Sequence, residues 1–182
     1  MVYFMIPIIK SKLFVLRPFK RGDEVSLRRS VNDWHIYRYT ALIPYPYTMK
    51  HARDWIKKNI SLNSNPKKGE INFAIVIDGN VVGGIGLRSM WMTEVETHKA
   101  EIGYWLAKRH WGKGIMTEAV RLVTDYAFKH LKLQRIYAAV MSNNKASARI
   151  LEKVGFNFEG TLKRNYLKDG KFIDAIMYAK TR

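Results

Sequence analysis

The stretch that most restricts the folds open to this chain is residues 101–131, EIGYWLAKRHWGKGIMTEAVRLVTDYAFKHL. Residues 101–107 are mostly apolar or aromatic, which is typical of a strand buried on both faces. A basic turn with two glycines follows at 109–114. From Ile115 onward the apolar residues recur at helical spacing. The stretch therefore predicts a strand that passes through a glycine turn into a long helix.

The glycine turn is suited to binding an anion. Gly112 and Gly114 would let a phosphate come close to the backbone, and the first amides of the following helix lack partners within the helix. Four side chains at the turn can carry positive charge: Lys108, Arg109, His110 and Lys113. The expected ligand is therefore a polyphosphate. The turn fits neither the P-loop nor the dinucleotide fingerprint, whose third glycine is Thr117 here, so a strand-turn-helix without a ligand is the alternative.

The rest of the chain alternates between strand and helix patterns. Strands are expected at 12–18, 70–78, 81–88, 98–107, 134–141, 156–167 and 171–179, and helices at 21–31, 48–62, 115–131 and 144–154. Residues 32–47 are rich in aromatics and prolines and are expected to be irregular. The apolar start, residues 1–11, is too short to span a bilayer and is expected to form an extra strand or an N-terminal arm.

Composition narrows the function classes. The chain has 182 residues without a linker or repeat, so we expect a single domain over 1–182. It has no cysteine, which excludes disulfides, thiolate metal sites and an acyl-cysteine intermediate and fits a cytoplasmic protein. His35, His51 and His98 are too scattered along the chain for a metal site, so no metal is expected.

The net charge is +17, from 32 Lys and Arg against 15 Asp and Glu. Such a charge favours polyanionic partners, for example nucleic acid, an acidic protein surface or an anionic cofactor. A lysine-rich solvated surface explains the same charge equally well. No zinc-finger, RNP or heptad pattern accompanies it, so charge alone does not decide the function.

The motifs, taken in order, resemble one family. Arg109, Gly112 and Gly114 form an Arg-x-x-Gly-x-Gly turn directly after EIGYWL, which resembles the acetyl-CoA signature of the GCN5-related N-acetyltransferase (GNAT) superfamily. Together with this turn, AEIGYW at 100–105, Asn-x-x-Ser at 144–147 running into EKVGF, and Glu-Gly at 159–160 resemble its ribosomal-protein, RimJ/RimL-like group. The resemblance covers residues 12–180, and the expected order of elements matches the GNAT topology.

The resemblance implies a mixed α/β (α+β) fold, the GNAT acyl-CoA N-acyltransferase fold. The central sheet would be mixed but largely antiparallel, with about seven strands and about four helices. It would splay between its fourth and fifth strands, and the pantetheine arm of acetyl-CoA would fill the gap.

The resemblance also implies how acetyl-CoA would bind. Backbone amides of the turn, helped by the helix dipole, would hold the pyrophosphate; the residues are Arg109, Trp111, Gly112, Lys113, Gly114, Ile115 and Met116. Backbone groups of Tyr104, Trp105, Leu106 and Ala107 would pair with the pantetheine amides, and one N–H would polarise the thioester carbonyl. Asn144 would hydrogen-bond the pantetheine or else cap the helix that follows it, and Ser147 would also lie at the cofactor.

Acetyl transfer needs a neutral amine, so a carboxylate acting directly or through water could take the proton of the amine. Glu101 is the candidate base, and the alternative is a structural carboxylate paired with a nearby Arg or Lys. Many GNAT enzymes carry a tyrosine that protonates the departing thiolate, but Leu151 occupies that position here. Ser147 or Tyr166 could replace it, and a thiolate leaves easily enough that no acid need act.

The acceptor pocket is expected between the irregular segment and the last hairpin, lined by Trp34, Tyr37, Tyr45, Tyr47 and Tyr166, unless these aromatics only cover the core. The expected function is acetyl-CoA-dependent transfer to a primary amine, with the N-terminal α-amine of a protein at the ribosome as the acceptor. The alternatives are a small amine, such as a polyamine, aminoglycoside or amino acid, and a non-catalytic RNA-binding protein on the same fold. The expected oligomeric state is a monomer or a homodimer.

Overall fold

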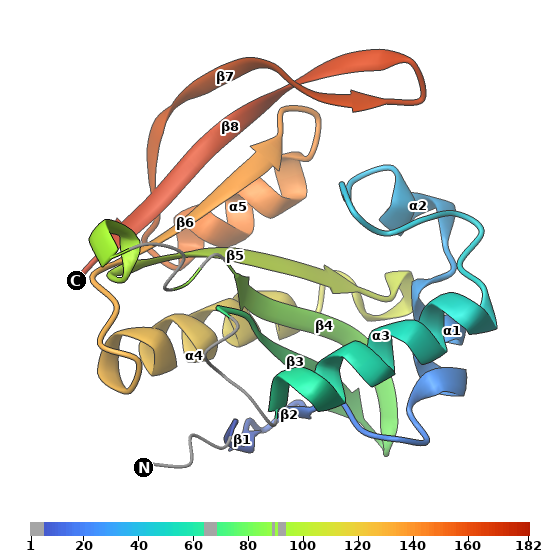
Figure 1. Cartoon of the computed structure of the whole chain (residues 1–182). Helices are drawn as coiled ribbons and strands as arrows, with labels where there is room; N and C mark the ends of the chain where they lie inside the picture. Colours follow the sequence, from blue (N-terminus) through green and yellow to red (C-terminus); the bar gives the residue numbers. More distant parts are fainter. Residues whose placement is uncertain (1–5, 64–68, 89, 91–93) are drawn as a thin grey trace.

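The computed structural model describes residues 6–63, 69–88, 90 and 94–182, which form one sheet with helices on both faces (Figure 1). The strands are β1 (Ile9–Lys10), β2 (Val15–Pro18), β3 (Ile71–Ile77), β4 (Asn80–Arg88), β5 (Lys99–Leu106), β6 (Arg135–Met141), β7 (Asn157–Lys168) and β8 (Lys171–Thr181). The α-helices are α1 (Glu24–Val31), α2 (Trp34–Tyr37), α3 (Met49–Asn63), α4 (Ile115–Lys129) and α5 (Lys145–Lys153). Two 3₁₀ turns, η2 (Glu94–Glu96) and η3 (Lys108–His110), lie on either side of β5 in the chain.

The strands follow the order β1-β2-β3-β4-β5-β6-β8-β7. All neighbouring pairs are antiparallel except β5 and β6, which run parallel because α4 carries the chain back between them. Strands β5 and β6 are hydrogen-bonded to each other only where residues 99–101 lie opposite residues 135–137. Beyond that point β6 continues to pair with β8 as far as Met141. The opening between residues 102–106 of β5 and 138–141 of β6 is called the seam below. Counted from β2, the seam lies between the fourth and fifth strands, which confirms the expected splay.

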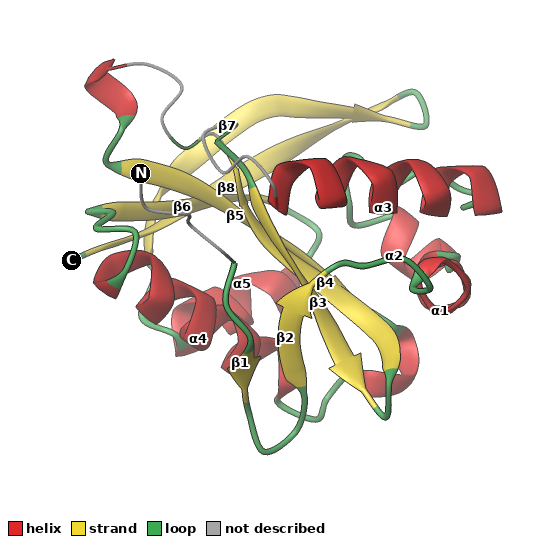
Figure 2. Ribbon diagram, turned by 60° about the horizontal axis from the view of Figure 1, so that its bottom comes forward, coloured by secondary structure: helices red, strands yellow, loops and turns green. Residues whose placement is uncertain are grey.

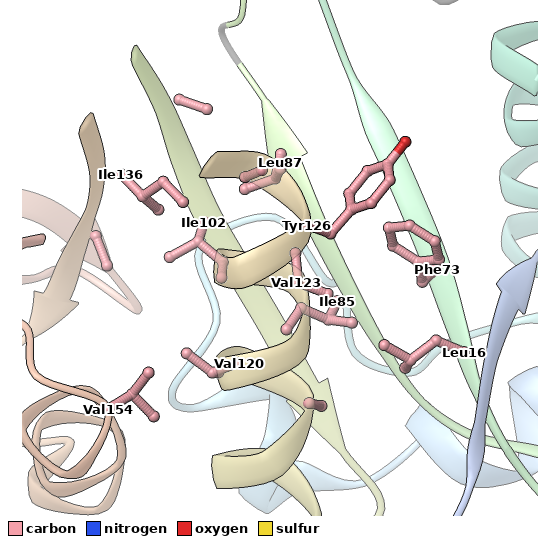
Figure 3. Packing of buried hydrophobic residues seen from close by; sticks show 14 of the residues in the cluster. Leu16, Phe73, Ile85, Leu87, Ile102, Val120, Val123, Tyr126, Ile136 and Val154 are labelled. Atoms are coloured by element: carbon pink, nitrogen blue, oxygen red, sulfur yellow. The ribbon is translucent and has the colours of Figure 1, made fainter. Parts of the chain in front are cut away.

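One face of the sheet packs against α4 and α5 (Figure 2). Side chains alternate between the faces of a strand, so Phe73 and Ile75 of β3 lie on this face together with Val120, Val123 and Tyr126 of α4. Figure 3 shows this cluster with α4 lying along the strands. Each large apolar side chain buried in this way contributes about 1.5–3 kcal/mol. The packing fixes the start of α4 beside the end of β5 and thereby fixes the turn that joins them.

The other face packs against α1 and α3. Ala74 and Val76 of β3 lie in a second cluster with Leu27 and Val31 of α1 and Ile56 of α3. The two clusters therefore use alternate residues of the same strand, as expected for a strand buried on both faces.

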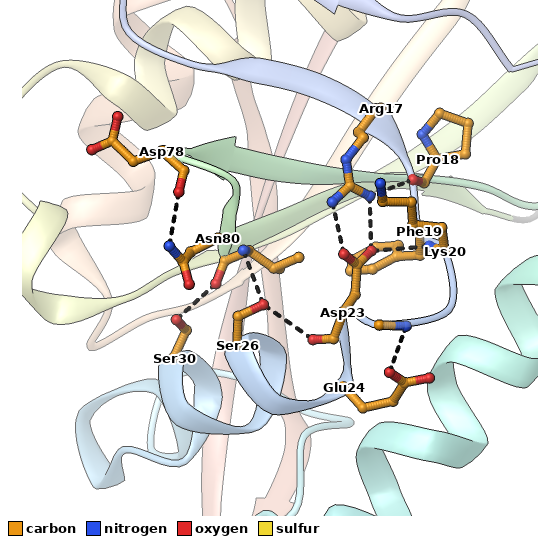
Figure 4. Close-up of polar contacts among 12 residues, drawn as sticks. Arg17, Pro18, Phe19, Lys20, Asp23, Glu24, Ser26, Ser30, Asp78 and Asn80 are labelled. Carbon is orange, nitrogen blue, oxygen red and sulfur yellow. Dashed lines mark hydrogen bonds and ion pairs between the residues drawn. The ribbon is translucent and has the colours of Figure 1, made fainter.

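Helix α1 begins at Glu24, three residues later than the sequence predicted, because Asp23 is held outside it. The Arg17 guanidinium donates to both carboxylate oxygens of Asp23, at 2.8 and 2.7 Å, and the Lys20 amide donates to the same carboxylate at 2.9 Å (Figure 4). Further along α1, the hydroxyl of Ser30 donates to the carbonyl of Val81 at 2.8 Å. The Ser30 bond ties α1 to the beginning of β4, and the bonds of Asp23 with Arg17 tie the start of α1 to β2.

One other expectation needs correction. The segment 32–47 is not wholly irregular, because Asp33 caps the short helix α2 by accepting from the His35 amide at 2.7 Å; the described chain thus has five α-helices. Residues 9–10 pair with β2, which confirms the extra strand expected at the start of the chain and gives the sheet eight strands. Of the expected connection at 89–96, residues 89 and 91–93 lie outside the described residues.

None of the described helices has the length and apolar character needed to cross a bilayer.

Candidate active site

A cavity of about 1040 Å³ opens at the seam, with walls from the α1–α3 region, β4, β5, β6, α5 and β7. Three glycines of β4 and β5 line this cavity: Gly84, Gly86 and Gly103. A Cβ at Gly86 would stand 2.1 Å from Oδ1 of Asn72, and one at Gly84 would stand 2.7 Å from Nε1 of Trp105. The side chains of Asn72 and Trp105 therefore lie across β4, while the space above Gly103 stays open.

The turn between β5 and α4 presents free backbone amides at one end of this cavity. Gly112 and Gly114 have left-handed φ angles of 73° and 76°, and a Cβ on either would meet no atom within 4 Å. The N–H groups of residues 112–117 find no partner within the described chain, and the first bond back from the helix joins the Glu118 N–H to the Gly114 carbonyl. A run of free amides at a helix N-terminus, with open space in front of the glycines, fits a phosphate group.

Positive charge surrounds the turn. Nζ of Lys108 lies 3.3 Å from Nε2 of His35, which belongs to α2. Nε of Arg109 donates to Nε2 of His110 at 3.1 Å. Burial lowers the pKa of His110, and the charges of Arg109 and Lys113 lower it further. The His110 ring is therefore neutral near pH 7 and accepts that bond, while the lysines and Arg109 supply the charge for a polyphosphate.

The backbone of β5 faces the seam at alternate residues. The N–H of Ala107 donates to the carbonyl of Val82 on β4 at 2.8 Å, and the same register continues along both strands. In an antiparallel pair every second residue bonds its main-chain N–H and C=O to the neighbouring strand. On β5 and directly after it, these residues include Trp105 and Ala107, whose main-chain groups face β4. Tyr104 and Leu106 point theirs into the seam, where an extended amide-bearing arm could pair with them.

Trp111 lies at the outer end of the seam. Its indole N–H donates to the carbonyl of Leu106 at 2.7 Å, and the side chain remains partly exposed. The carbonyl of Leu106 is therefore already bonded to Trp111, and the N–H of Leu106 is the main-chain group that can bond a ligand in the seam. The same bond links the glycine turn to the end of β5.

Ser147 meets Tyr104 across the seam, and Asn144 holds the main chain of Ser147. Asn144 is the N-cap of α5, because its Oδ1 accepts from the Ser147 N–H at 3.2 Å. The Tyr104 phenol oxygen lies 2.8 Å from Oγ of Ser147, and burial raises the pKa of that phenol well above its usual range. Leu151 is fully buried in the core and does not reach the cavity.

Glu101 lines the cavity at the point where the seam begins, and it is paired with Arg88 of β4. Nε of Arg88 donates to one carboxylate oxygen at 3.0 Å and Nη2 donates to the other at 2.6 Å. These bonds raise the pKa of Arg88. Tyr166 lines the same cavity and donates to the carbonyl of Ala139 on β6 at 3.0 Å. Burial and the charge of Glu101 raise the pKa of the Tyr166 phenol, so that phenol stays protonated near pH 7.

Three of the expected acceptor aromatics form one cluster. The rings of Trp34 and Tyr37 have centroids 5.0 Å apart, and Tyr45 lies 5.7 Å from Trp34 and 5.8 Å from Tyr37. Tyr47 is buried in the second core cluster while one edge lines the cavity. Tyr166 approaches from β7 on the far side of the cavity.

Two hydrogen bonds join the tip of the β7–β8 hairpin to the segment around α2; we call this pair of contacts the clasp. The Tyr37 phenol donates to Asp169 at 2.5 Å, and Nζ of Lys168 donates to the carbonyl of Thr40 at 2.8 Å. Figure 1 shows the hairpin tip reaching toward α2. A second cavity of about 350 Å³ lies beside the clasp, between residues 41–44 and 166–169.

Residues 14–157 match the family model described as an acetyltransferase (GNAT) domain. The chain therefore belongs to the GNAT acetyltransferase family. The probable N-acetyltransferase YjcK of Bacillus subtilis is 47% identical over 170 residues, which cover 92% of this GNAT chain and 93% of the relative. The spermidine N(1)-acetyltransferase of Escherichia coli K12 is 29% identical over 161 residues, which cover 88% and 82% of the two chains.

Solved GNAT structures share the architecture. The ribosomal-protein-S5-alanine acetyltransferase of Vibrio fischeri superimposes with a TM-score of 0.84 at 25% identity and covers 97% of each chain. Mycobacterium smegmatis RimJ in complex with CoA-disulfide superimposes with a TM-score of 0.79 at 29% identity, over 92% of this chain and 81% of the other. This GNAT protein is thus an acetyl-CoA-dependent N-acetyltransferase with a RimJ/RimL-like structure.

Some cavity residues of this GNAT enzyme were not expected from the sequence. Arg149 and Lys153 line the cavity from α5, and Arg88 and Asn72 line it from β4 and β3. Arg149 and Lys153 are four residues apart and so lie on one helix face, a signal that a search for basic helix faces would have found. Arg88 and Asn72 depend on strand register and carry no local signal.

Proposed function

We propose that this GNAT enzyme transfers the acetyl group directly from acetyl-CoA to the N-terminal α-amine of a protein, with a ribosomal protein as the acceptor. The observation that carries this proposal concerns the carboxylates that line the cavity. Among the described residues, each has a cationic partner: Asp54 with Lys50, Glu70 with Lys58, and Glu101 with Arg88. A polyamine brings several positive charges and needs unpaired carboxylates, whereas an N-terminal amine brings one charge.

The outer end of the site supports a long acceptor. The main cavity and the second cavity share residues 41–44 and Tyr166 in their walls. An acceptor whose amine lies near Glu101 can therefore continue toward the hairpin tip along exposed apolar side chains such as Leu42 and Leu167. A polypeptide acceptor can follow such a path in an extended form and contact these apolar side chains.

Relatives give independent support for this acceptor class. The Vibrio fischeri protein that superimposes over 97% of each chain is named for acting on an alanine of ribosomal protein S5. The spermidine acetyltransferase is similar over 88% of this chain, which makes a small amine the alternative acceptor. The net charge of +17 also repels polycations and attracts an anionic particle such as the ribosome.

In this proposal the amides of residues 112–117 hold the pyrophosphate, and Arg149 and Lys153 supply charge for the remaining phosphate. The N–H groups of Tyr104 and Leu106 pair with the pantetheine arm along the seam. Bound acetyl-CoA supplies an acetyl group activated as a thioester. A protein without cysteine has no acyl-cysteine route, which supports direct transfer with both substrates bound.

Glu101 is the proposed acceptor of the amine proton. Both of its oxygens accept hydrogen bonds from Arg88, so neither oxygen is left without a partner to meet the amine directly. Proton removal through a water molecule on the cavity side of the carboxylate meets this constraint. The negative charge also attracts the ammonium form of the acceptor to the start of the seam.

The test compares acceptors for the purified enzyme with acetyl-CoA. The acceptors are ten-residue peptides with a free N-terminal alanine or serine, the same peptides with a blocked N-terminus, and spermidine. Release of CoA thiol gives the rate, and mass spectrometry locates the acetyl group. We expect α-amine acetylation of the free peptides, no reaction of the blocked ones, and a kcat/KM for spermidine at least about tenfold lower. Faster acetylation of spermidine would reject the proposed acceptor in favour of a small amine.

A second arm addresses the ribosomal acceptor. Proteins stripped from ribosomes are incubated with the enzyme and labelled acetyl-CoA, and their N-terminal peptides are analysed by mass spectrometry. The proposal expects label at the N-terminus of one or a few of these proteins. Label confined to a control mixture of non-ribosomal proteins would place the acceptor elsewhere.

A further inference from the structure

A buried phenol meets a serine hydroxyl across the seam. Tyr104 lies on β5 and Ser147 on α5, and both line the main cavity. The phenol oxygen of Tyr104 stands 2.8 Å from Oγ of Ser147 and 3.4 Å from the Ser147 carbonyl oxygen. The shorter distance identifies the hydroxyl as the main partner of the phenol.

Either hydroxyl of this contact can donate to the other. Burial raises the pKa of the Tyr104 phenol well above its usual range, so the phenol keeps its proton. The main chain of Ser147 is fixed separately, because its N–H donates to Oδ1 of Asn144. When Tyr104 donates to Oγ, the hydrogen of the serine hydroxyl cannot point back at the phenol. It is then free to point into the cavity.

We propose that Tyr104 is a positioning residue, which holds Ser147 so that the serine hydroxyl donates a hydrogen bond into the seam to the sulfur atom of CoA. This inference rests on the proposed function, since that function places the pantetheine arm in the seam. It assigns a role to the Tyr104 side chain, beyond the backbone role expected for that residue.

The proton balance of the reaction limits what this pair can do. The new N–C bond forms while the C–S bond breaks, the electron pair of that bond stays on sulfur, and the amine loses one proton. That proton ends on sulfur or in water. Tyr104 is not its source, because its phenol holds a proton more strongly than a thiol does. The pair therefore stabilises the departing sulfur by a hydrogen bond and contributes no net proton.

The arrangement also accounts for Leu151. Leu151 is fully buried in the core and cannot donate to a ligand in the cavity. Tyr104 brings a phenol to the start of α5 from the strand side, and Ser147 extends its reach into the cavity. A hydroxyl can thus reach the sulfur without a tyrosine on α5.

The test measures the pKa of the thiol of bound CoA and needs no acceptor. CoA is bound to the enzyme, and thiolate absorbance in the ultraviolet is followed as the pH rises. A hydrogen bond to sulfur stabilises the thiolate, so the wild type is expected to lower the thiol pKa. Tyr104→Phe and Ser147→Ala should each raise it by about one unit relative to wild type, and the double variant should raise it no further. Ser147→Thr keeps the hydroxyl and should retain most of the lowering.

Tyr178→Phe is the matched control. Tyr178 also reaches α5 with its phenol, donating to Glu152 at 2.8 Å, but it does not line the cavity. This variant loses a bond between a strand and α5 and should leave the thiol pKa unchanged. Tyr104→Phe removes a single oxygen and keeps the ring packing, and thermal unfolding of each variant verifies the fold.

The outcomes separate this inference from the proposed function. A thiol pKa in Tyr104→Phe or Ser147→Ala equal to that of wild type, with CoA still bound, would overturn the inference alone. Additive effects in the double variant would also overturn it, because Tyr104 would then act independently of Ser147. A wild type that fails to bind CoA would reject both proposals.

Discussion

The ion pair of Glu101 with Arg88 shows how much one residue can depend on its partner. The sequence predicted Glu101 at the start of the opened part of the sheet, because the strand pattern ends at a recognisable turn. It could not predict Arg88 as the partner. That pairing depends on the register of β4 with β5, which the intervening connection does not reveal. Glu101 is therefore both the proposed base and the ion-pair partner of Arg88.

The role of Glu101 can be tested by the pH dependence of Glu101→Gln. The α-amine of a peptide has a pKa of about 8, so below that pH it is mostly protonated and needs a base. We expect kcat/KM to fall about 10²-fold at low pH, with the loss shrinking as the pH rises through the amine pKa. Steady-state rates across this pH range give the profile.

Arg88→Gln is the control for that experiment, because it breaks the same ion pair and keeps the carboxylate. It should change the rate without removing the pH dependence that the amine imposes. Equal profiles for both variants would mean that Glu101 serves only as the partner of Arg88.

At the scale of elements, long patterns were predicted well and short ones were not. Helix α4 begins at Ile115 as expected, because a glycine turn precedes fifteen residues of helical periodicity. The four-residue helix α2 was missed, since its stability comes from the Asp33 cap and from contacts with distant parts of the chain. The twist that opens the seam depends on which strand β6 prefers as a partner, and that choice has no local signal.

The turn before α4 can be tested as an element by Gly112→Ala. The φ of 73° makes any side chain here unfavourable by about 1 kcal/mol, and the added methyl would stand in the open space in front of the amides. We expect the affinity for CoA, measured by calorimetry, to fall at least about tenfold.

Gly22→Ala is the matched variant, because Gly22 also has a positive φ, 93°, and open space around its Cβ position. It should lower the thermal stability by a similar amount and bind CoA like the wild type. A similar loss of CoA affinity in both variants would indicate a general loss of stability and not a phosphate site.

At the scale of the whole molecule, the proposed acceptor side is closed by two segments that lie far apart in the sequence. The clasp joins Tyr37 and Thr40 to the tip of the last hairpin at residues 168–169. The sequence placed both segments at the acceptor site but could not show that they touch, since about 130 residues separate them. The proposed donor side, in contrast, comes mostly from one continuous stretch, residues 101–116, so its parts could be predicted together from the sequence.

Asp169→Ala should loosen the clasp by removing the partner of the Tyr37 phenol. The acceptor walls would then be less pre-organised, so the KM for a peptide acceptor should rise about threefold while CoA affinity stays unchanged. Lys163→Ala breaks an exposed ion pair with Asp174 in the same hairpin, away from its tip, and should leave both values unchanged. An unaltered peptide KM in Asp169→Ala would show that the clasp does not shape the acceptor site.

The short pairing of β5 with β6 divides the sheet into two plates. One plate contains β1 to β5 and the other contains β6, β8 and β7, and three residue pairs at 99–101 and 135–137 connect them. Helix α4 also joins the two plates, because its Val120 and Val123 lie in one buried cluster with Ile102 of β5 and Ile136 of β6. Glu101 occupies the last of these pairs, opposite Tyr137. The backbone of the proposed base is therefore held by the last rung of the sheet before the strands part.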